Sequence, residues 1–465
     1  MELPKKHLHC SFPPQGLPIR HKNSIIISKI QVSYHFQEEL FVNMKNKTLG
    51  SKVVQHLIAA ARNATPSPLK KLAKKIFRIK DSNVIKHHQK LLDEILKKEK
   101  DNQREIIIFP PSLDWNVQLF QRPQQLALAL GRQGALVFYL QPKPNRKQPP
   151  FHLIEENIYL CNVHVDVFHA LPNPFIYLLT WNSDYARCFN HPRILYDFVD
   201  DIDVFYGERD QIIRGHEFLL RNAHIVLATA NKLIEEVKIY RPDVIYSPNG
   251  VVYEHFARAA KNEYSVPPQD LADPVASQQP IIGYYGALAR WFDYDLFKKV
   301  AFLRPNYQFV VIGPNYDGTL EHTDLLKIPN IHWLGVKPYK ELPHYLQYFD
   351  VATIPFIVND ITHATSPLKL FEYMAGEKPV VITPMRESMN YAGVLIAQDA
   401  EEFATQLDNA LLKKDDPEYR TLLRKTALEN TWDERAKVLL DALLEKSNHY
   451  SSNLKDSSDQ VPQCS

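Results

Sequence analysis

Short, unbroken apolar segments recur along this chain, and stretches with helical periodicity separate most of them. The first is "EIIIF" at 105–109, and "ALVFYL" at 135–140 follows a helical stretch that begins near Pro123. An unbroken apolar run of this length is typical of a parallel strand that is buried on both faces. Strands that alternate with helices in this way predict an open, doubly wound parallel sheet.

The alternation stops once and then restarts. Further apolar runs of the first series lie at 175–181, 193–199, 224–230 and 244–250. A polar, proline-containing linker at 257–279 interrupts the series. The second series lies at 281–287, 308–313, 331–335, 351–356 and 379–384, and a helical stretch at roughly 417–444 follows it. We therefore expect an α/β protein with two tandem Rossmann-like domains, one over 104–256 and one over 280–447.

The two ends of the chain lack this alternation. Residues 1–103 form a mostly helical N-terminal extension, with helical stretches at 66–80 and at about 83–98. The first stretch is amphipathic and lysine-rich, so it either lies on an anionic membrane surface or packs on the neighbouring domain with its lysines in water. The serine-rich residues 448–465 predict a disordered tail.

Composition limits the class of protein. The 465 residues include 55 basic and 53 acidic side chains, so we expect local charged patches and no nucleic-acid partner. The four cysteines, at positions 10, 161, 188 and 464, show no C-x-x-C spacing. We therefore expect neither a zinc site nor a disulfide framework. No apolar run of about 18 residues and no signal-peptide core occur, so we expect a cytoplasmic protein.

Familiar nucleotide signatures are absent from the chain. It contains no G-x-G-x-x-G after the first strand of either domain, no G-x-x-x-x-G-K-[ST] and no H-E-x-x-H. A dinucleotide dehydrogenase or a P-loop enzyme is therefore excluded. In open α/β sheets, ligands bind at the carboxyl ends of the strands, so we expect the site in a cleft that both sheets face.

Four loops at the carboxyl edge of the second predicted sheet carry candidate binding residues. Each of three loops holds a glycine that a cation or a proline follows within four residues. The candidate binding residues in these loops are Gly286, Arg290, Gly313, Gly335 and Val336. Glycine lets the backbone approach a ligand closely.

The fourth loop, "THATSPLKLFEYMAGEKPVV" at 362–381, opens a predicted helix. Thr365 and Ser366 stand before Pro367, which suits the first helical position, and Ser366 either caps the helix or turns its hydroxyl toward a ligand. Lys369 lies in the first turn, where a cation opposes the helix dipole unless an anion shares the site. This segment indicates either a diphosphate site or an ordinary capped helix with a surface pair between Lys369 and Glu372.

Segments from both predicted domains resemble bacterial glycosyltransferases of the GT-B fold, and most closely the family 4-like enzymes of teichuronic acid biosynthesis. In the second domain these are "YYGALARWFDYDL", "NIHWLGVKPYKELPHYLQYFDVATIPF" and "SPLKLFEYMAGEKPVV". In the first they are "LFQRPQQLALAL", "LYDFVDDIDVF" and "IYSPNGVVYEHF". The resemblance covers roughly residues 105–390.

The resemblance implies a transferase, of hexosyl type, that uses a nucleoside-diphosphate sugar as donor, with UDP favoured over GDP, and no cofactor. It implies a saccharide or lipid-linked acceptor, a role in cell-surface polysaccharide synthesis and a place at the inner face of the cell membrane. The implied nucleotide-binding residues are Gly286, Arg290, Gly313, Gly335, Val336, Thr365, Ser366, Lys369 and Glu372. Among these, Glu372 would hold the ribose hydroxyls, and Arg290 and Lys369 would act in catalysis by neutralising the leaving diphosphate.

The chain departs from the family pattern at two positions. Many relatives carry a second glutamate eight residues before the ribose glutamate, and Ala364 stands there in this chain. A lysine expected five residues after Arg290 is replaced by Asp295. The sequence therefore leaves open whether transfer inverts or retains the configuration of the sugar.

The acceptor side is predicted from the loop "LYDFVDDIDVF". Asp200 is our candidate general base, with Asp197 and Asp201 as competitors, because an inverting transferase must deprotonate its acceptor. Arg122 and Asp197 are candidate acceptor-binding residues, and Arg122 either meets an acidic acceptor or pairs with a nearby carboxylate. Asp201 and Asp203 also spell D-x-D, a pattern that binds divalent cations in another glycosyltransferase fold, but we expect no metal site here.

Two other functions remain open from the sequence. A sugar-nucleotide epimerase of the same fold would need no acceptor site. A non-catalytic subunit would use the basic stretch at 66–80 to dock on a membrane or a partner, although the charged residues Arg290, Lys369 and Glu372 argue for catalysis.

Overall fold

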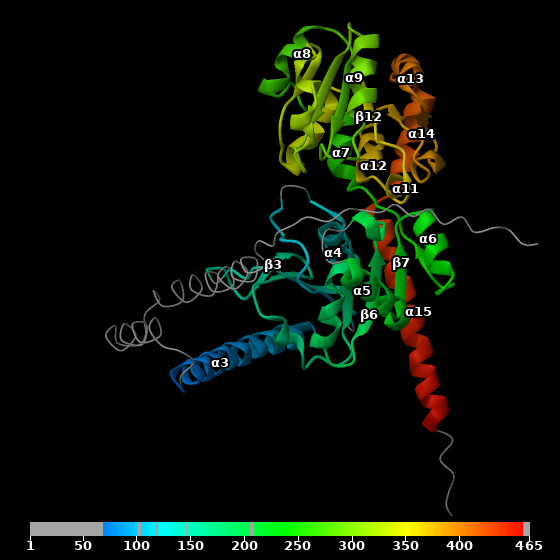
Figure 1. Cartoon of the computed structure of the whole chain (residues 1–465). Coiled ribbons are helices and arrows are strands. Elements are labelled where there is room, and N and C mark those ends of the chain that lie inside the picture. The colour runs from blue at the N-terminus through cyan, green and yellow to red at the C-terminus, as the bar shows by residue number, and fades with distance from the viewer. Residues whose placement is uncertain (1–67, 100–103, 118–119, 146, 205–208, 459–465) are drawn as a thin grey trace, which may run out of the picture. The chain divides into compact units, whose positions relative to one another are not determined.

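The computed structural model describes residues 68–99, 104–117, 120–145, 147–204 and 209–458 (Figure 1). The chain divides into two compact units, residues 1–83 and 84–465, and each is treated by itself. The predictions for residues 1–67 and 459–465 lie outside the described residues. The side chains of 68–81 are also outside them, so the basic face of the stretch at 66–80 stays a prediction.

The N-terminal domain of the second unit is built on an eight-stranded sheet with the order β3-β4-β2-β1-β5-β6-β7-β8. Its strands are β1 (Ile106–Phe109), β2 (Leu136–Leu140), β3 (Phe151–Glu155), β4 (Ile158–Cys161), β5 (Phe175–Leu178), β6 (Arg193–Phe198), β7 (Ile225–Ala228) and β8 (Ile245–Tyr246). The predicted doubly wound sheet is confirmed. We missed β3 and β4, and β3 pairs antiparallel with β4, so this sheet is not wholly parallel. The edge strand β3 has no fully buried residue, so it lacks the unbroken apolar run that marks a central strand.

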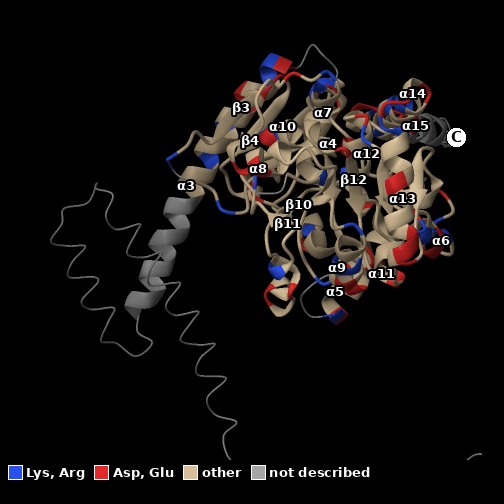
Figure 2. Cartoon of the chain, turned by 90° about the horizontal axis from the view of Figure 1, so that it is seen from above, with Lys and Arg blue, Asp and Glu red and all other residues tan. Residues whose placement is uncertain are grey.

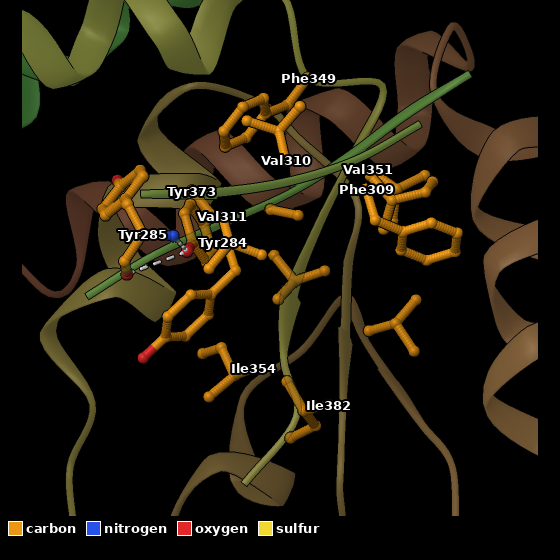
Figure 3. Packing of buried hydrophobic residues seen from close by; sticks show 14 of the residues in the cluster. Tyr284, Tyr285, Phe309, Val310, Val311, Phe349, Val351, Ile354, Tyr373 and Ile382 are labelled. Carbon is orange, nitrogen blue, oxygen red and sulfur yellow. Dashed lines mark hydrogen bonds between the residues drawn. The ribbon is translucent and has the colours of Figure 1, made fainter. Parts of the chain in front are cut away.

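The C-terminal domain is built on a six-stranded parallel sheet with the order β11-β10-β9-β12-β13-β14. Its strands are β9 (Ile281–Tyr285), β10 (Gln308–Ile312), β11 (Ile331–Trp333), β12 (Val351–Ile354), β13 (Val380–Ile382) and β14 (Val394–Ile396). Figure 3 shows aromatic and aliphatic side chains from these strands packed together, with Tyr373 beside Tyr285. The Tyr285 backbone N–H donates to the Tyr373 hydroxyl at 2.9 Å, which ties helix α12 (Leu368–Ala375) to the end of β9.

Helices connect the strands in both domains. In the N-terminal domain they are α4 (Arg122–Arg132), α5 (Arg209–Asn222) and α6 (Asn231–Lys238). After β8 come α7 (Tyr253–Ala260), α8 (Ala272–Ala276), α9 (Tyr294–Leu303), α10 (Leu342–Gln347), α11 (Asp360–His363), α12 (Leu368–Ala375), α13 (Ala400–Lys413), α14 (Pro417–Leu428) and α15 (Trp432–Ser458). The predicted linker at 257–279 is therefore partly helical, and α7 packs against α10 and α12 of the C-terminal domain.

Helix boundaries differ from the predictions at both ends of the chain. The two N-terminal stretches form one helix, α3 (Pro68–Glu99), because "KDSN" at 80–83 contains weak helix formers but neither glycine nor proline. The predicted helical stretch at 417–444 is two helices, α14 and α15. The predicted disordered tail is also helical as far as Ser458, since no glycine or proline follows Trp432 within α15.

The last helix packs on the N-terminal domain. Helix α15, red in Figure 1, lies against α4. Trp432, Ala436, Leu439 and Leu443 of α15 are buried in one cluster with residues of β1, β2 and α4. The helices after β14 were all predicted to belong to the C-terminal domain, and for α15 that prediction is wrong. The apolar stripe of α15 indicates that this face is buried, but it does not indicate which of the two sheets covers it.

Basic and acidic residues are interspersed over the helices rather than gathered by sign (Figure 2). Among residues 68–458 as described, no helix is long and apolar enough to cross a membrane. Cys161 and Cys188 are free thiols, whereas Cys10 and Cys464 lie outside the described residues.

Replacing the buried Trp432 by alanine is expected to lower the free energy of unfolding by about 3–5 kcal/mol, because it leaves a cavity between α15 and the first sheet. Urea denaturation followed by circular dichroism measures the change. The control is Leu444→Ala on the same helix, where the side chain is 52% exposed and the expected change is about 0.5 kcal/mol or less. Equal effects would contradict the packing of α15 described above.

Candidate functional site

Three glycine turns follow β9, β10 and β11 and lie side by side. The Gly286 amide donates to the carbonyl of Ile312 at 2.9 Å, and the Gly313 amide donates to the carbonyl of Gly335 at 2.8 Å. All three glycines have positive φ angles, of 146°, 145° and 68°. A Cβ at Gly313 would lie 1.8 Å from the carbonyl oxygen of Gly286, so only glycine fits there. The structure thus brings three of the predicted loops together at one edge of the sheet.

Lys369 lies against the first of these turns. It is the second residue of α12, and an ideal Cβ at Gly286 would lie 2.6 Å from its Cε atom. Its ammonium is 4.9 Å from the ring centroid of Phe356 and 5.6 Å from that of Tyr284. The missing Cβ therefore makes room for a lysine whose charge is held mainly by aromatic faces.

Glu372 lies one turn after Lys369 and is buried, with 6% of its surface exposed. Burial raises the pKa of Glu372 to about 7, and the nearby Lys369 charge opposes this rise. Burial also lowers the pKa of Lys369 to about 8, against the effect of Glu372. The protein alone does not fully stabilise either charge, which is a common property of ligand-binding groups.

The two hydroxyl residues before α12 are bonded within the protein. The Ser366 hydroxyl accepts from the Asn249 amide N–H at 3.1 Å, and the Ser366 carbonyl accepts from the Asn249 side chain at 2.5 Å. The Thr365 hydroxyl donates to the Ile361 carbonyl at 3.0 Å. The helix begins at Leu368 with Pro367 at its N-cap, so Ser366 does not cap it, and the first of the two alternatives for this residue is wrong. Asn249 holds Ser366 outside the helix instead.

Arg290 and Val336 lie on the outer loops of the site. The Arg290 backbone N–H donates to Asp317 at 2.9 Å, and its side chain is exposed. Val336 is 39% exposed and follows the third glycine turn. These positions leave both side chains accessible to a ligand from solvent.

The two departures from the family pattern have structural counterparts. Ala364 is fully buried and packs in an apolar cluster of the N-terminal domain, so a charged group at this position would be buried among apolar side chains. Asp295 pairs with Lys298 at 2.9 Å on α9. Neither residue supplies a charge to the turns that surround Lys369.

Asp200 lies just beyond the carboxyl end of β6 and is half-buried. Burial raises its pKa to about 7, the negative charges of Asp201 and Asp197 add to the rise, and Arg122 opposes it. A carboxylate with this pKa can take up a proton near neutral pH.

Arg122 and Asp197 form a buried ion pair, with Nε–Oδ2 and Nη2–Oδ1 distances of 2.6 Å and 3.0 Å. Arg122 also donates to the Pro248 carbonyl and the Ser247 hydroxyl, each at 3.1 Å. The Tyr177 hydroxyl donates to Asp197. The structure uses both side chains internally, at the base of the loop that carries Asp200.

The D-x-D carboxylates each have a cationic partner. Asp201 pairs with Lys232 at 3.2 Å, and Asp203 pairs with Arg209. Within the described part of the chain, no group of three or more His, Cys, Asp or Glu side chains could hold a metal ion.

Sequence reasoning missed the residues that position the site. Asn249 lies in the segment "SPNG", where an Asn-Gly pair indicates a turn and not a partner for Ser366. Phe356 and Tyr284 lie in apolar strand runs and read as core residues. Their approach to Lys369 follows from strand order, for which the sequence carries no local signal.

Comparison with known proteins places these features in a family context. Residues 279–413 match the family described as "Glycosyl transferases group 1". A Bacillus subtilis (strain 168) protein, provisionally named a teichuronic acid biosynthesis glycosyltransferase, TuaH, is 25% identical over 236 residues. The match covers 48% of this chain and 58% of that relative, so it spans little more than half of the relative's length.

Solved structures share the fold at low sequence identity. A glycosyltransferase from Rickettsia africae is 13% identical with a TM-score of 0.56, covering 74% of this chain and 99% of that one. Anabaena HepE, solved with UDP and glucose, is 12% identical with a TM-score of 0.53, covering 73% and 99%. A sucrose-phosphate synthase from Thermosynechococcus elongatus is 17% identical with a TM-score of 0.52, covering 76% and 100%. The chain therefore has the GT-B fold that its sequence predicts.

Replacing Gly313 by alanine is expected to lower the free energy of unfolding by about 1–3 kcal/mol more than the same change at Gly318. Both glycines have positive φ angles, but only the Gly313 methyl would meet backbone, since nothing lies within 4 Å of a Cβ at Gly318. Thermal denaturation of the two variants measures the difference. Equal stabilities would show that the turns after β9 and β10 do not approach as closely as described.

Proposed function

We propose that this protein is a glycosyltransferase that moves a hexosyl group from a UDP-sugar to a saccharide or lipid-linked acceptor in cell-surface polysaccharide synthesis. The observation that carries the proposal is the position of Lys369, at the start of α12 and against the Gly286 turn. The matched family, the TuaH resemblance and the UDP-bound fold relative support it.

The first step is binding of the donor. The α12 N-terminus offers backbone N–H groups, which favour phosphate oxygens, and the glycine turns let a ligand approach their backbone closely. A diphosphate beside Lys369 would restore the charge that burial disfavours, raising the pKa of Lys369 from about 8. We assign the Glu372 carboxylate, one turn further along α12, to accepting hydrogen bonds from the ribose hydroxyls.

The second step is departure of the nucleotide. Negative charge grows on the diphosphate as the bond to the sugar breaks, so cations fixed beside it stabilise the transition state more than the ground state. Lys369 and Arg290 are the cations that we assign to this task, together with backbone amides. Because these charges are built into the chain, we propose a reaction that needs no metal, and full activity in excess chelator is the expected result.

The third step is attack by the acceptor. Asp200, on the N-terminal domain, is our general base, and its raised pKa suits proton uptake near neutral pH. This assignment supports an inverting displacement. Arg122 and Asp197 bind each other, so we assign them to holding the Asp200 loop rather than to contact with the acceptor.

The membrane part of the hypothesis rests on sequence alone. Association of residues 66–80 with an anionic surface at the inner face of the cell membrane stays a prediction, because the described side chains begin beyond this stretch. A lipid-linked acceptor would give such an association a purpose.

Lys369→Ala and Arg290→Ala are each expected to lower kcat by about 10²–10³, with a smaller effect on KM, because they remove charge that acts mainly on the leaving group. Steady-state rates of transfer from a panel of UDP- and GDP-sugars to a lipid-linked saccharide measure kcat and KM. Lys299→Ala is the control, since this exposed lysine lies on α9 of the same domain. Unchanged turnover in both site variants would refute the assignment.

The pH dependence of kcat/KM is expected to be bell-shaped. The rate rises through about pH 7 as Asp200 loses its proton and falls above about pH 8 as Lys369 loses its charge. Asp200→Asn should remove the acid limb and lower the rate by about 10²-fold or more. Glu372→Gln, which changes the other group with a pKa of about 7, should keep the limb. If Glu372→Gln lost the acid limb and Asp200→Asn kept it, Asp200 would not be the general base.

A further inference from the structure

A buried carboxylate of the C-terminal domain is bonded to groups of the N-terminal domain. Glu387 follows β13 and is fully buried. Its Oε2 atom accepts from the backbone N–H of Asn231 at 2.8 Å and from the Asn231 side chain at 3.2 Å. Its Oε1 atom accepts from the Tyr246 hydroxyl. All of these donors belong to the N-terminal domain.

Glu387 takes the place of a helix cap. Helix α6 begins at Asn231, and its own N-cap residue, Ala230, has no side chain that can accept from the first turn. The first N–H groups of a helix need acceptors, and a negative charge there also interacts favourably with the helix dipole. The first turn of α6 is therefore completed from the other domain.

Two further residues of α6 reach the C-terminal domain. The Lys232 ammonium donates to the Asp360 carbonyl at 2.9 Å and to Asp201 at 3.2 Å. Glu235 accepts from Arg386 at 2.9 Å. Lys232 thus joins the residue beside Asp200 to α11, the short helix that leads into the Ser366 loop and α12.

We propose that Glu387 is a positioning residue, which holds α6 against the C-terminal domain and so sets the place of Asp200 relative to the donor site on α12. This inference rests on the proposed function for the roles of Asp200 and Lys369. Glu387 touches neither reacting group and acts through α6 and Lys232.

The chemistry of the contact favours this role over simple packing. A buried carboxylate is stable only while its hydrogen bonds are made, and loss of one partner leaves a charge that burial penalises. Separation of the two domains would remove three of the donors to Glu387 at once. The hydrogen bonds of Glu387 to the N-terminal domain therefore either all form or are all replaced by water. Such a contact suits a residue that aligns the two domains.

The chain offers a matched pair of variants. The Tyr391 hydroxyl lies 3.2 Å from the same Glu387 oxygen and 2.9 Å from the Tyr246 hydroxyl, but Tyr391 belongs to the C-terminal domain. Both changes remove the contact between the two hydroxyls. They differ in the bond to Glu387, because Tyr246→Phe removes the one that comes from the N-terminal domain, whereas Tyr391→Phe removes the one that comes from within the C-terminal domain. A role in local packing predicts similar effects of the two changes.

The test combines hydrogen exchange, UDP binding and turnover. In Glu387→Gln and Tyr246→Phe, we expect amides of α6 to exchange about fivefold faster and kcat to fall by about tenfold or more, with Tyr391→Phe near the wild type. The Kd for UDP should stay within about twofold, because the predicted donor site lies wholly in the C-terminal domain.

Unchanged α6 exchange in Glu387→Gln, equal effects of the two tyrosine variants, or loss of UDP affinity in step with kcat would each overturn the proposal. Failure of the wild type to bind UDP would instead overturn the proposed function. The α6 exchange data need no substrate, so they still decide whether Glu387 holds the helix.

Discussion

The close approach of the Gly286 and Gly313 turns is the constraint on which the candidate site depends. A Cβ on Gly313 would occupy the position of the Gly286 carbonyl, and a Cβ on Gly286 would displace Lys369. Because β9, β10 and β11 are parallel neighbours, their carboxyl ends place these turns together, and α12 then brings Lys369 onto them. The raised pKa of Glu372 and the lowered pKa of Lys369 follow from burial in that position.

The N-terminal domain contributes a different kind of order. The buried pair of Arg122 and Asp197 joins the first helix of the sheet to β6 and to the segment after β8. Such a pair costs desolvation energy, and its extra hydrogen bonds offset that cost. Asp200, three residues after Asp197, keeps a raised pKa because the effect of burial outweighs the opposing charge of Arg122. The pairing thus separates a structural carboxylate, in β6, from the carboxylate that we propose as the base, in the loop after that strand.

Much of the fold could be predicted from the sequence, because unbroken apolar runs report strands that are buried on both faces. Edge strands such as β3, which are only half-covered, escaped this criterion. The glycine turns, Lys369 and Glu372 were found from residue type and spacing. The contact of the Lys369 ammonium with Phe356 and Tyr284 was not predicted, because both aromatic residues lie in apolar runs that indicate a buried core. Of the two alternatives for Ser366, capping of the helix is wrong, because Asn249, more than a hundred residues earlier, bonds to Ser366.

By itself, the sequence determined two α/β series, the glycine turns and a helix whose first turn contains a lysine. These are local properties, set by periodicity, backbone freedom and the helix dipole, so they leave a trace in neighbouring residues. Only the tertiary structure decided that α15 returns to the first sheet, that Arg122 binds Asp197 and that Glu387 completes α6. Partners of this kind are distant in the chain, and hydrogen-bond and packing complementarity between them depends on how the elements meet.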